Sequence, residues 1–300
     1  MLSILIPTYN HNCCPLVDSL GKQIIKSGKE CEIICIDDAS VKVFSEIDAK
    51  LKEFSFFTHI KLNKNVGRSR IRNLLASKAQ YNWILFLDAD TLPTHPKFIE
   101  NYINIIESNP KKYIYSGGLA YRKKDYKKKN SLRYKYGIKR ESIDAEKRNR
   151  NPYTSLLMSN TLLKKEIFDK TGFNDKITLY GHEDAVFSFD LYGAGFSVKH
   201  IDNKVYHTGL ESNDVFIEKT KVAVKNLWYL YMQSLIHPEM NRLLKSYTRV
   251  KKWGISSVFS LLYSTFHSKI EEKLKQENPS LRLFDIYRLS YLCHVSNLEN

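Results

Sequence analysis

Residues 84–93 read ILFLDADTLP, an apolar run that leads directly into two aspartates, Asp88 and Asp90. A short apolar run bounded by polar residues predicts a buried strand. Two carboxylates at the end of such a strand repel each other, and they lose hydration if the strand end is covered. We therefore expect a positive partner there, and the stretch alone leaves open a metal ion, an arginine or solvent.

Strands and helices alternate on both sides of this stretch. Strands are predicted at residues 2–7 ("LSILIP"), 31–37 ("CEIICID"), 59–63 ("HIKLN") and 82–88 ("NWILFLD"). Between them, apolar residues recur at helical spacing after Pro15, over 43–54 and over 71–79. Strict alternation of this kind predicts an α/β fold with a mainly parallel central sheet covered by helices on both faces.

Polar residues follow several of the predicted strands. In open parallel sheets, ligands bind at the edge where the carboxyl ends of the strands meet. The residues that fall at such ends are Asn10, Asp37, Asp38, Asp88 and Asp90. Because they come from separate strands and converge on one edge, the sequence predicts a ligand site there.

Asp88 and Asp90 have the spacing of a cation site. Residues two apart on a strand point to the same side, and just past the strand both can reach one ligand. Two carboxylates suit a hard divalent cation, Mg²⁺ or Mn²⁺, that keeps positions open for phosphate oxygens. The alternative is a solvated turn in which an aspartate caps a helix that begins near Pro96.

Three further stretches carry candidate site residues. In "NVGRSRIRN", Arg68 and Arg72 lie one helical turn apart and suit either a diphosphate or solvent. In "GHEDAV", Glu183 and Asp184 suit either proton transfer from a hydroxyl or the start of a helix, which favours acids. In "KVYHTG", His207 is either a packed histidine or a third metal ligand.

The charge of the chain is uneven. The 300 residues carry a net charge of +15, and 43% are hydrophobic, enough for a full core in one or two domains. Residues 121–150 contain 13 Lys/Arg and 4 Asp/Glu without a clean period, which predicts a loop or connecting segment. It suits an anionic substrate, an anionic membrane surface or nucleic acid. Because no nucleic-acid-binding motif accompanies it, we expect no nucleic-acid partner.

The rest of the composition favours a cytoplasmic protein. The five cysteines form no CxxC pair and no zinc-ligand spacing, as expected of reduced thiols. No basic segment precedes the first apolar run, and the longest later one, 253–266, is shorter than the about 20 residues of a membrane span. We expect a cytoplasmic protein with an α/β catalytic domain at 1–210, the lysine-rich segment inside it, and a helical extension at 211–300.

Taken in order, these motifs resemble the family 2 glycosyltransferases, which have the nucleotide-sugar-binding GT-A fold. The resemblance runs from Ser3 to about His207, roughly two-thirds of the chain. It is carried by "SILIPTYN", "IICIDDAS", "NKNVGRSRIRN", "WILFLDADTLP", "SNTLLKKEIFDKTGFND", "GHEDAVFSFDLYGAGF" and "VYH".

The resemblance implies a role for each matching residue. The donor nucleotide is expected to contact Pro7, Thr8, Tyr9, Asp38, Arg72, Asn73 and Asp88. Asp90 and His207 are expected to hold the metal, and Asp184 is expected to be the catalytic base. Glu183 and Asn160 are weaker candidates for acceptor contact or support. Two positions depart from the family pattern: Asp190 stands where many members have an arginine, and Thr171 begins "TGF" in place of "GGF".

The resemblance implies an inverting, metal-dependent glycosyltransferase of polysaccharide biosynthesis. Its expected donor is a UDP-sugar, and its expected acceptor is a glycan or a lipid-linked glycan. The segment "VKKWGISSVFSLLYSTF" mixes cations with an apolar face, which favours peripheral contact with the inner leaflet of a membrane. The competing hypotheses are a nucleotidyltransferase, a polyanion- or nucleic-acid-binding protein, and an inactive scaffold on the same fold.

Overall fold

The structure is a computed structural model that describes residues 1–108 and 113–298. Its contacts divide the chain into two compact units. The first contains Met1–Tyr121, Ser142–Thr178 and Asp190–Gly209, and the second contains Arg122–Glu141, Leu179–Phe189 and Leu210–Asn300. Among the described helices, none combines the length and the apolar character that crossing a membrane requires.

The first unit is built on a seven-stranded sheet and a three-stranded sheet. The larger has the order β3-β2-β1-β4-β8-β6-β9, and the smaller has the order β5-β10-β7. The strands are β1 (Leu2–Thr8), β2 (Cys31–Asp37), β3 (Phe57–Lys61), β4 (Trp83–Leu87), β5 (Thr91–Pro93), β6 (Tyr113–Ser116), β7 (Leu119–Ala120), β8 (Asn160–Lys164), β9 (Ser197–His200) and β10 (Val205–His207). The mainly parallel sheet is confirmed, and β8 is the exception because it runs antiparallel to both β4 and β6.

Helices cover both faces of the larger sheet. They are α1 (Cys14–Ser27), α2 (Glu46–Glu53), α3 (Arg68–Lys78), α4 (Phe98–Glu107), α6 (Ala145–Asn149), the short η4 (Tyr153–Ser155) and α7 (Lys165–Thr171). Alternate residues of each strand point to opposite faces. Ile4 and Leu85 join residues of α1 and α4 in one buried layer, whereas the ring of Phe86 on the other face packs against Phe168 of α7.

Two predicted elements differ from the structure. The face expected over 43–54 does not cover the core, because α2 contains no buried residue and Val43 is 83% exposed. Phe54, the last residue of that predicted face, is the one that is buried. Strand β3 begins at Phe57, two residues before the predicted start, because Phe57 is buried and pairs with Ile33 of β2.

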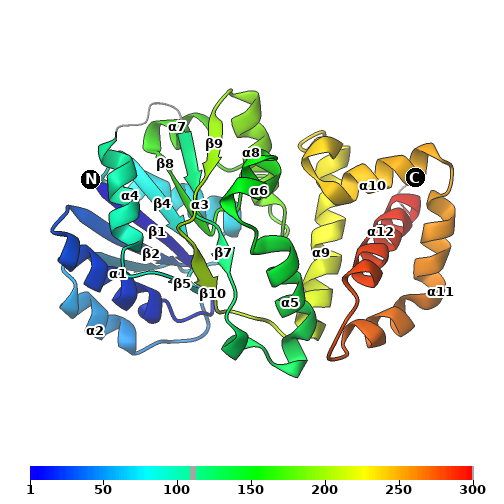
Figure 1. Ribbon diagram of the computed structural model, residues 1–300, viewed down its shortest axis with the longest axis horizontal. Helices are drawn as coiled ribbons and strands as arrows, with labels where there is room; N and C mark the ends of the chain where they lie inside the picture. Colours follow the sequence, from blue (N-terminus) through cyan, green and yellow to red (C-terminus); the bar gives the residue numbers. More distant parts are fainter. Residues whose placement is uncertain (109–112, 299–300) are drawn as a thin grey trace. The chain divides into compact units, whose positions relative to one another are not determined.

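The second unit is helical, as expected of the C-terminal third. Its elements are η1 (Lys123–Asp125), η2 (Lys128–Asn130), α5 (Ser131–Tyr136), the π-helical turn η3 (Gly137–Glu141), α9 (Asn213–Met232), η5 (Pro238–Met240), α10 (Arg242–Lys252), α11 (Ser256–Leu274) and α12 (Leu281–Leu298). Helix α12 lies between α9 and α11 and packs on both (Figure 1). Helix α8 (Glu183–Gly193) begins in this unit and ends in the first.

The lysine-rich stretch, expected as a loop or connecting segment over 121–150 within the domain at 1–210, is helical over much of its length. Residues 142–150 group with the first unit, whereas residues 122–141 form helical turns and group with the second. Leu132 is fully buried there, and the ring of Tyr136 packs against Phe216 and Phe284. These partners lie far away in the sequence, so a search for local periodicity could not reveal them.

Candidate functional site

The loops that follow β1 and β2 are locked together at the carboxyl edge of the sheet. Asn10 donates its backbone N–H to Ser40 Oγ at 2.6 Å, and its side-chain oxygen accepts from the backbone N–H groups of Val41 and Lys42. Asn10 and Ala39 adopt positive φ angles of 52° and 62°. Such angles are unfavourable for alanine and concentrate at functional sites, where surrounding contacts hold them.

Residues 7–9 lie at the same edge. The hydroxyl of Thr8 donates to the carbonyl of His11 at 2.9 Å, and the carbonyl of Thr8 accepts from the N–H of Asp38. Pro7 is half-buried, whereas Tyr9 is 53% exposed. The turn is therefore fixed by its backbone, and the Tyr9 ring is accessible to a ligand.

Asp38 is buried and organises the loop before α3. Its two carboxylate oxygens accept hydrogen bonds from the backbone N–H groups of Val66 at 2.6 Å and Gly67 at 3.0 Å. Asn65 donates its side-chain amide to the carbonyl of Asp38 at 3.2 Å. Much of the acceptor capacity of Asp38 therefore serves the fold and places the start of α3 beside the sheet edge.

The positive partner expected at Asp88 is an arginine. Arg72 of α3 is buried, and its Nη2 lies 3.2 Å from Asp88 Oδ1. The guanidinium also lies over the ring of Phe173, 5.3 Å from its centroid. A buried cation paired in this way holds the Asp88 carboxylate in place, and 30% of the Asp88 side chain stays exposed for a ligand.

Asn73, the neighbour of Arg72, serves the scaffold. Its amide nitrogen donates to the carbonyl of Phe173 at 2.9 Å and to Asp175 Oδ1 at 2.7 Å, and its oxygen accepts from the N–H of Phe173. These bonds tie α3 to the loop after α7. Asn73 therefore keeps Phe173 beneath Arg72.

Asp90 is brought next to His207 by the small sheet. Strands β5 and β10 pair antiparallel with His207 opposite Thr91, which places Asp90 beside the end of β10. His207 Nε2 lies 3.4 Å from Asp90 Oδ2, and the carbonyl of Asp90 accepts from both the N–H and the hydroxyl of Thr208 at 2.8 Å. A Cβ on Gly209 would lie 2.3 Å from Asp90 Oδ2. The glycine therefore leaves room for this carboxylate.

The donor set fits a divalent cation. An aspartate oxygen and an imidazole nitrogen already face each other, and His207 Nδ1, which is buried, has no hydrogen-bond partner among the described residues. No three His, Cys, Asp or Glu side chains of the described chain gather closely enough to hold a metal by themselves. Asp90 and His207 would therefore leave coordination positions for water or for phosphate oxygens, as Mg²⁺ sites commonly do.

Asn160 holds together, by hydrogen bonds, segments that lead to the strand ending in His207. It accepts from the hydroxyl of Tyr102 at 2.6 Å and donates to the carbonyls of Gly118 and Asn203 at 3.0 and 2.8 Å. Asn160 is fully buried, and Gly118 precedes β7, which pairs with the strand that ends in His207. Its position makes Asn160 a supporting residue.

Glu183 and Asp184 lie in the second unit, in the first turn of α8. Glu183 is buried, and Asp184 is half-buried. They follow Gly181 and His182, which adopt positive φ angles of 95° and 68°. Asn226 of α9 donates to the carbonyl of Gly181. Burial and the positive charge of Arg288 lower the pKa of His182 to about 4.

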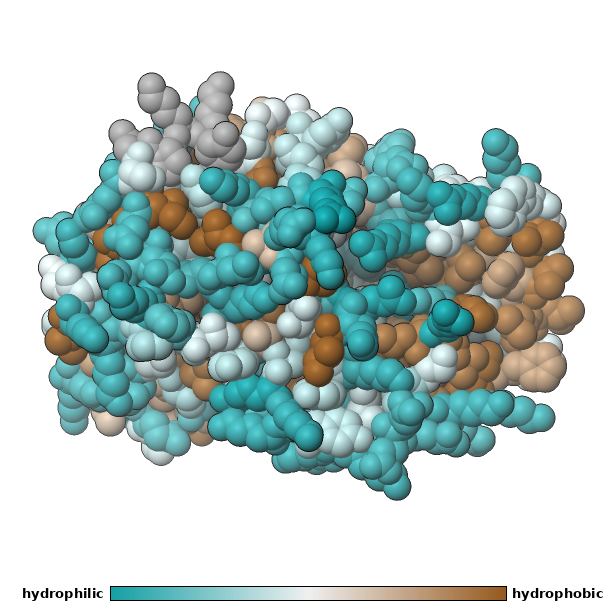
Figure 2. All heavy atoms as spheres, viewed as in Figure 1, coloured by the Kyte–Doolittle hydropathy of each residue, from teal (hydrophilic) through white to brown (hydrophobic). Residues whose placement is uncertain are grey.

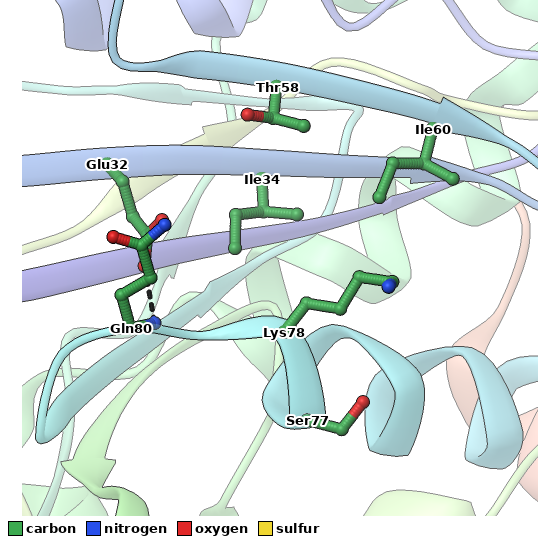
Figure 3. A pocket seen from close by; sticks show the side chains of 7 residues that line it. All are labelled: Glu32, Ile34, Thr58, Ile60, Ser77, Lys78 and Gln80. Carbon is green, nitrogen blue, oxygen red and sulfur yellow. Dashed lines mark hydrogen bonds between the residues drawn. The ribbon is translucent and has the colours of Figure 1, made fainter.

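A cleft of about 340 Å³ lies elsewhere on the first unit and contains none of these residues. It is lined by Glu32, Ile34, Thr58, Ile60, Ser77, Lys78 and Gln80. Figure 3 shows Lys78 extending from the end of α3 beneath the strands, while Glu32 accepts from the N–H of Gln80 at 2.7 Å. Glu32 stands at the start of β2, at the opposite end of that strand from Asp38.

Sequence reasoning missed several contributors to the site. Gly209 and Thr208 belong to "VYHTG", whose histidine was recognised, but their contacts with Asp90 depend on the pairing of two three-residue strands. Phe173 lies in the motif "TGFND", which gives no sign of its contact with Arg72. The local signal for Gly209 is a glycine two residues after the candidate ligand His207.

Comparisons with known proteins identify the family of this chain. The model of glycosyl transferase family 2 matches residues 3–172. Chondroitin synthase of Escherichia coli is 26% identical over 270 residues, which cover 78% of this chain and 38% of that protein. An uncharacterized glycosyltransferase of Haemophilus influenzae is 34% identical over 113 residues, 37% of this chain and 36% of that one. The chain thus spans less than two-fifths of these relatives.

Solved structures give the same fold. The structure of S. aureus TarS 1-349 in complex with UDP aligns over 100% of this chain and 92% of that chain, with a TM-score of 0.52 and 16% sequence identity. Poly-beta-1,6-N-acetyl-D-glucosamine synthase of Staphylococcus aureus (strain MSSA476) is 30% identical over 91 residues, 30% of this chain and 22% of that protein. Because the family model covers more than half of the chain, this protein belongs to glycosyl transferase family 2.

Proposed function

We propose that the enzyme transfers a hexosyl or N-acetylhexosaminyl group from a UDP-sugar to a hydroxyl of a glycan or lipid-linked glycan during polysaccharide biosynthesis. The observation that carries the proposal is the pairing of two acid sites at one sheet edge. Asp88 is paired with Arg72, whereas the Asp90 carboxylate lies beside His207 and Gly209. The first arrangement suits a polar contact with the ribose, and the second suits a cation on the diphosphate.

Each residue has a defined task in this proposal. Asp38, Asp88 and the turn around Tyr9 orient the nucleoside, and Arg72 holds Asp88. Asp90 and His207 would hold Mn²⁺ or Mg²⁺, which when bound supplies positive charge for the diphosphate leaving group.

The transfer step is a single displacement. The bond between the anomeric carbon and the diphosphate oxygen breaks, and the oxygen keeps the electron pair. The acceptor hydroxyl bonds to the same carbon from the opposite face, so the configuration inverts. Asp184 accepts the hydroxyl proton. A carboxylate suits this task because the hydroxyl proton becomes acidic as its oxygen bonds to the positively charged, oxocarbenium-like sugar carbon.

Release of UDP tests the chemistry. Purified protein is incubated with Mn²⁺ and UDP-linked hexoses or N-acetylhexosamines, and free UDP is quantified. Asp184→Asn is expected to lower kcat by about 100-fold or more while UDP affinity is retained. Asp169→Asn, at an exposed position of α7, is the matched control and is expected to match the unaltered enzyme. Full activity of Asp184→Asn would remove Asp184 as the base.

Contact with a membrane surface is a second part of the proposal. Residues 240–270 contain six Lys/Arg and no Asp/Glu. Around the turn between α10 and α11, Trp253, Val258 and Leu261 are 68%, 64% and 67% exposed. Figure 2 shows apolar side chains gathered over this part of the second unit. Exposed apolar side chains beside cations suit an anionic bilayer, where both are accommodated.

Flotation with liposomes tests this contact. The protein is expected to float with vesicles that contain an anionic phospholipid at low salt and to stay at the bottom of the gradient with zwitterionic vesicles. Replacing Trp253, Val258 and Leu261 by serine is expected to abolish flotation. Replacing Val41 and Val43, which are 85% and 83% exposed on the first unit, by serine is the control. Equal flotation of both variants would contradict the proposed contact.

A further inference from the structure

Within residues 121–150, several arginines form ion pairs, whereas a group of lysines is exposed and almost unpaired. Arg122, Arg133, Arg140 and Arg150 form ion pairs with Asp125, Glu141, Asp285 and Glu146. The lysine cluster, defined as Lys123, Lys124, Lys127, Lys128 and Lys129, is exposed. Among the described residues, Lys128 alone of the five forms an ion pair, a 3.9 Å contact with exposed Glu277. An exposed pair of this kind neutralises little charge.

The backbone of the lysine cluster is nevertheless fixed. Asn130 is buried, accepts from the N–H of Lys127 at 2.7 Å and donates to the carbonyl of Asp125 at 3.1 Å. Asn213 accepts from the N–H of Leu132 at 2.9 Å and donates to Ser131 Oγ at 3.1 Å. Five exposed lysines therefore project from ordered turns within seven consecutive residues, 123–129. Their mutual repulsion is unfavourable unless an anion is bound.

Helix α9 connects this cluster to the proposed base. Asn213, its first residue, anchors the turn after the cluster, and Asn226 donates to the carbonyl of Gly181, just before Glu183 and Asp184. Asn226 follows Asn213 by 13 positions, which correspond to roughly 20 Å along the helix axis. The cluster and Asp184 are thus attached to one rigid element at two separate points.

We propose that the lysine cluster binds an extended anionic acceptor, a glycan that carries carboxylate or phosphate groups, several sugars away from its reacting hydroxyl. The proposal rests on the proposed function, because it assigns Asp184 as the base at the other end. A short acceptor cannot span roughly 20 Å of helix, so it gains nothing from the cluster. A long anionic one gains affinity from every neutralised lysine, and that gain falls as salt rises.

Binding of labelled polymers tests the inference by fluorescence anisotropy. The probes are short and long hyaluronan fragments for carboxylate, short and long inorganic polyphosphate for phosphate, long neutral dextran and single-stranded DNA. The long fragment of at least one anionic polymer is expected to bind more tightly than its short fragment and than DNA, and dextran is not expected to bind. Replacing the five lysines by glutamine is expected to weaken that binding at least about tenfold, which is about 1.4 kcal/mol.

A matched variant distinguishes binding by the lysine cluster from nonspecific binding to the positive charge of the unit. Replacing Arg249, Lys251, Lys252, Lys269 and Lys273 by glutamine removes five exposed charges from α10 and α11 of the same unit. This variant is expected to keep most of the affinity. No binding of either long anionic polymer, equal losses in the two variants, or tighter binding of DNA would overturn the inference. UDP-dependent stabilisation of the unaltered protein, measured alongside, distinguishes failure of this proposal from failure of the proposed function.

Discussion

Two buried arginines of the first unit contrast with the lysine cluster of the second. Arg72 and Arg148 hold parts of the fold together: Arg72 pairs with Asp88, and Arg148 donates to the carbonyls of Ile143, Ser116, Gly117 and Ile201. The five lysines of the cluster are exposed, as are Arg249, Lys251 and Lys252 of α10. Buried cations position a site, whereas cations without internal partners are available to a ligand.

Arg148→Met is expected to have the largest effect on stability. It would leave four carbonyls and the Nδ1 atom of His200 without their donor, at a cost of about 3–5 kcal/mol. Chemical denaturation measures the free energy of unfolding. Arg150→Met, two residues later, removes an exposed pair with Glu146 and is expected to cost no more than about 1 kcal/mol. Equal costs would break the contrast between buried and exposed cations.

Acid is expected to destabilise the first unit through His200. Burial and the positive charge of Arg148 lower the pKa of His200 to about 4, and its Nε2–H donates to the carbonyl of Pro152. The unfolded chain, with an ordinary histidine pKa near 6.5, takes up the proton first as pH falls. The histidine's contribution is therefore complete above about pH 6.5 and is lost between about 6.5 and 4, at most about 3 kcal/mol.

His200→Gln is expected to make this loss shallower when unfolding is measured at pH 7 and pH 4.5. It is not expected to abolish the loss, because the pKa of His182 in the second unit is lowered in the same direction. An unchanged slope in the variant would show that His200 is already protonated in the fold.

Gly209→Ala tests whether the space beside Asp90 matters. The added Cβ would lie 2.3 Å from Asp90 Oδ2 and would displace the carboxylate from its place beside His207. We expect the Kd of UDP with Mn²⁺ to rise at least about tenfold by calorimetry. Gly193→Ala, where a Cβ would meet open space, is the control. Unchanged affinity in Gly209→Ala would mean that Asp90 does not contact the ligand.

The smallest expected effect is on the stability of the five-lysine variant. Four of the five lysines form no ion pair among the described residues, and the pair of Lys128 with Glu277 is exposed, so the free energy of unfolding is expected to change by about 0.5 kcal/mol or less. We expect the free energy of unfolding to rise, because the substitutions remove the repulsion among the lysines. A loss of several kcal/mol would mean that these lysines serve the fold, as the arginines of the first unit do.

Much of the first unit was predictable because its signals are local. The strand at Trp83–Leu87 ends in Asp88, and the helix that begins at Arg68 brings Arg72 to it. The placement of the second unit's early segment was not, since Leu132 and Tyr136 find their partners more than 70 residues away. The exposed Val43 had the right spacing for a helix face but no layer to pack against.

At the site, the sequence indicated which side chains gather but not what each one touches. That Asp90 faces His207 follows from the register of β5 and β10, which the sequence does not show. That Asn73 bonds to the loop at Phe173 likewise depends on a contact between distant segments. Carboxylate–backbone bonds such as those of Asp38 also have no sequence signature beyond the aspartate itself.

Thermal unfolding with nucleotides tests the central claim most directly. The midpoint is recorded with UDP, GDP, CDP and dTDP, with and without Mn²⁺, for the unaltered protein, Asp90→Asn and the control Asp169→Asn. UDP at about 100 times its Kd adds about 2.7 kcal/mol to the folded state, so a rise of several degrees is expected. We predict that this rise requires Mn²⁺, is retained in Asp169→Asn and is lost in Asp90→Asn. A folded protein that responds to none of the nucleotides, or an Asp90→Asn variant that responds fully, would contradict a metal-bound UDP-sugar at this sheet edge.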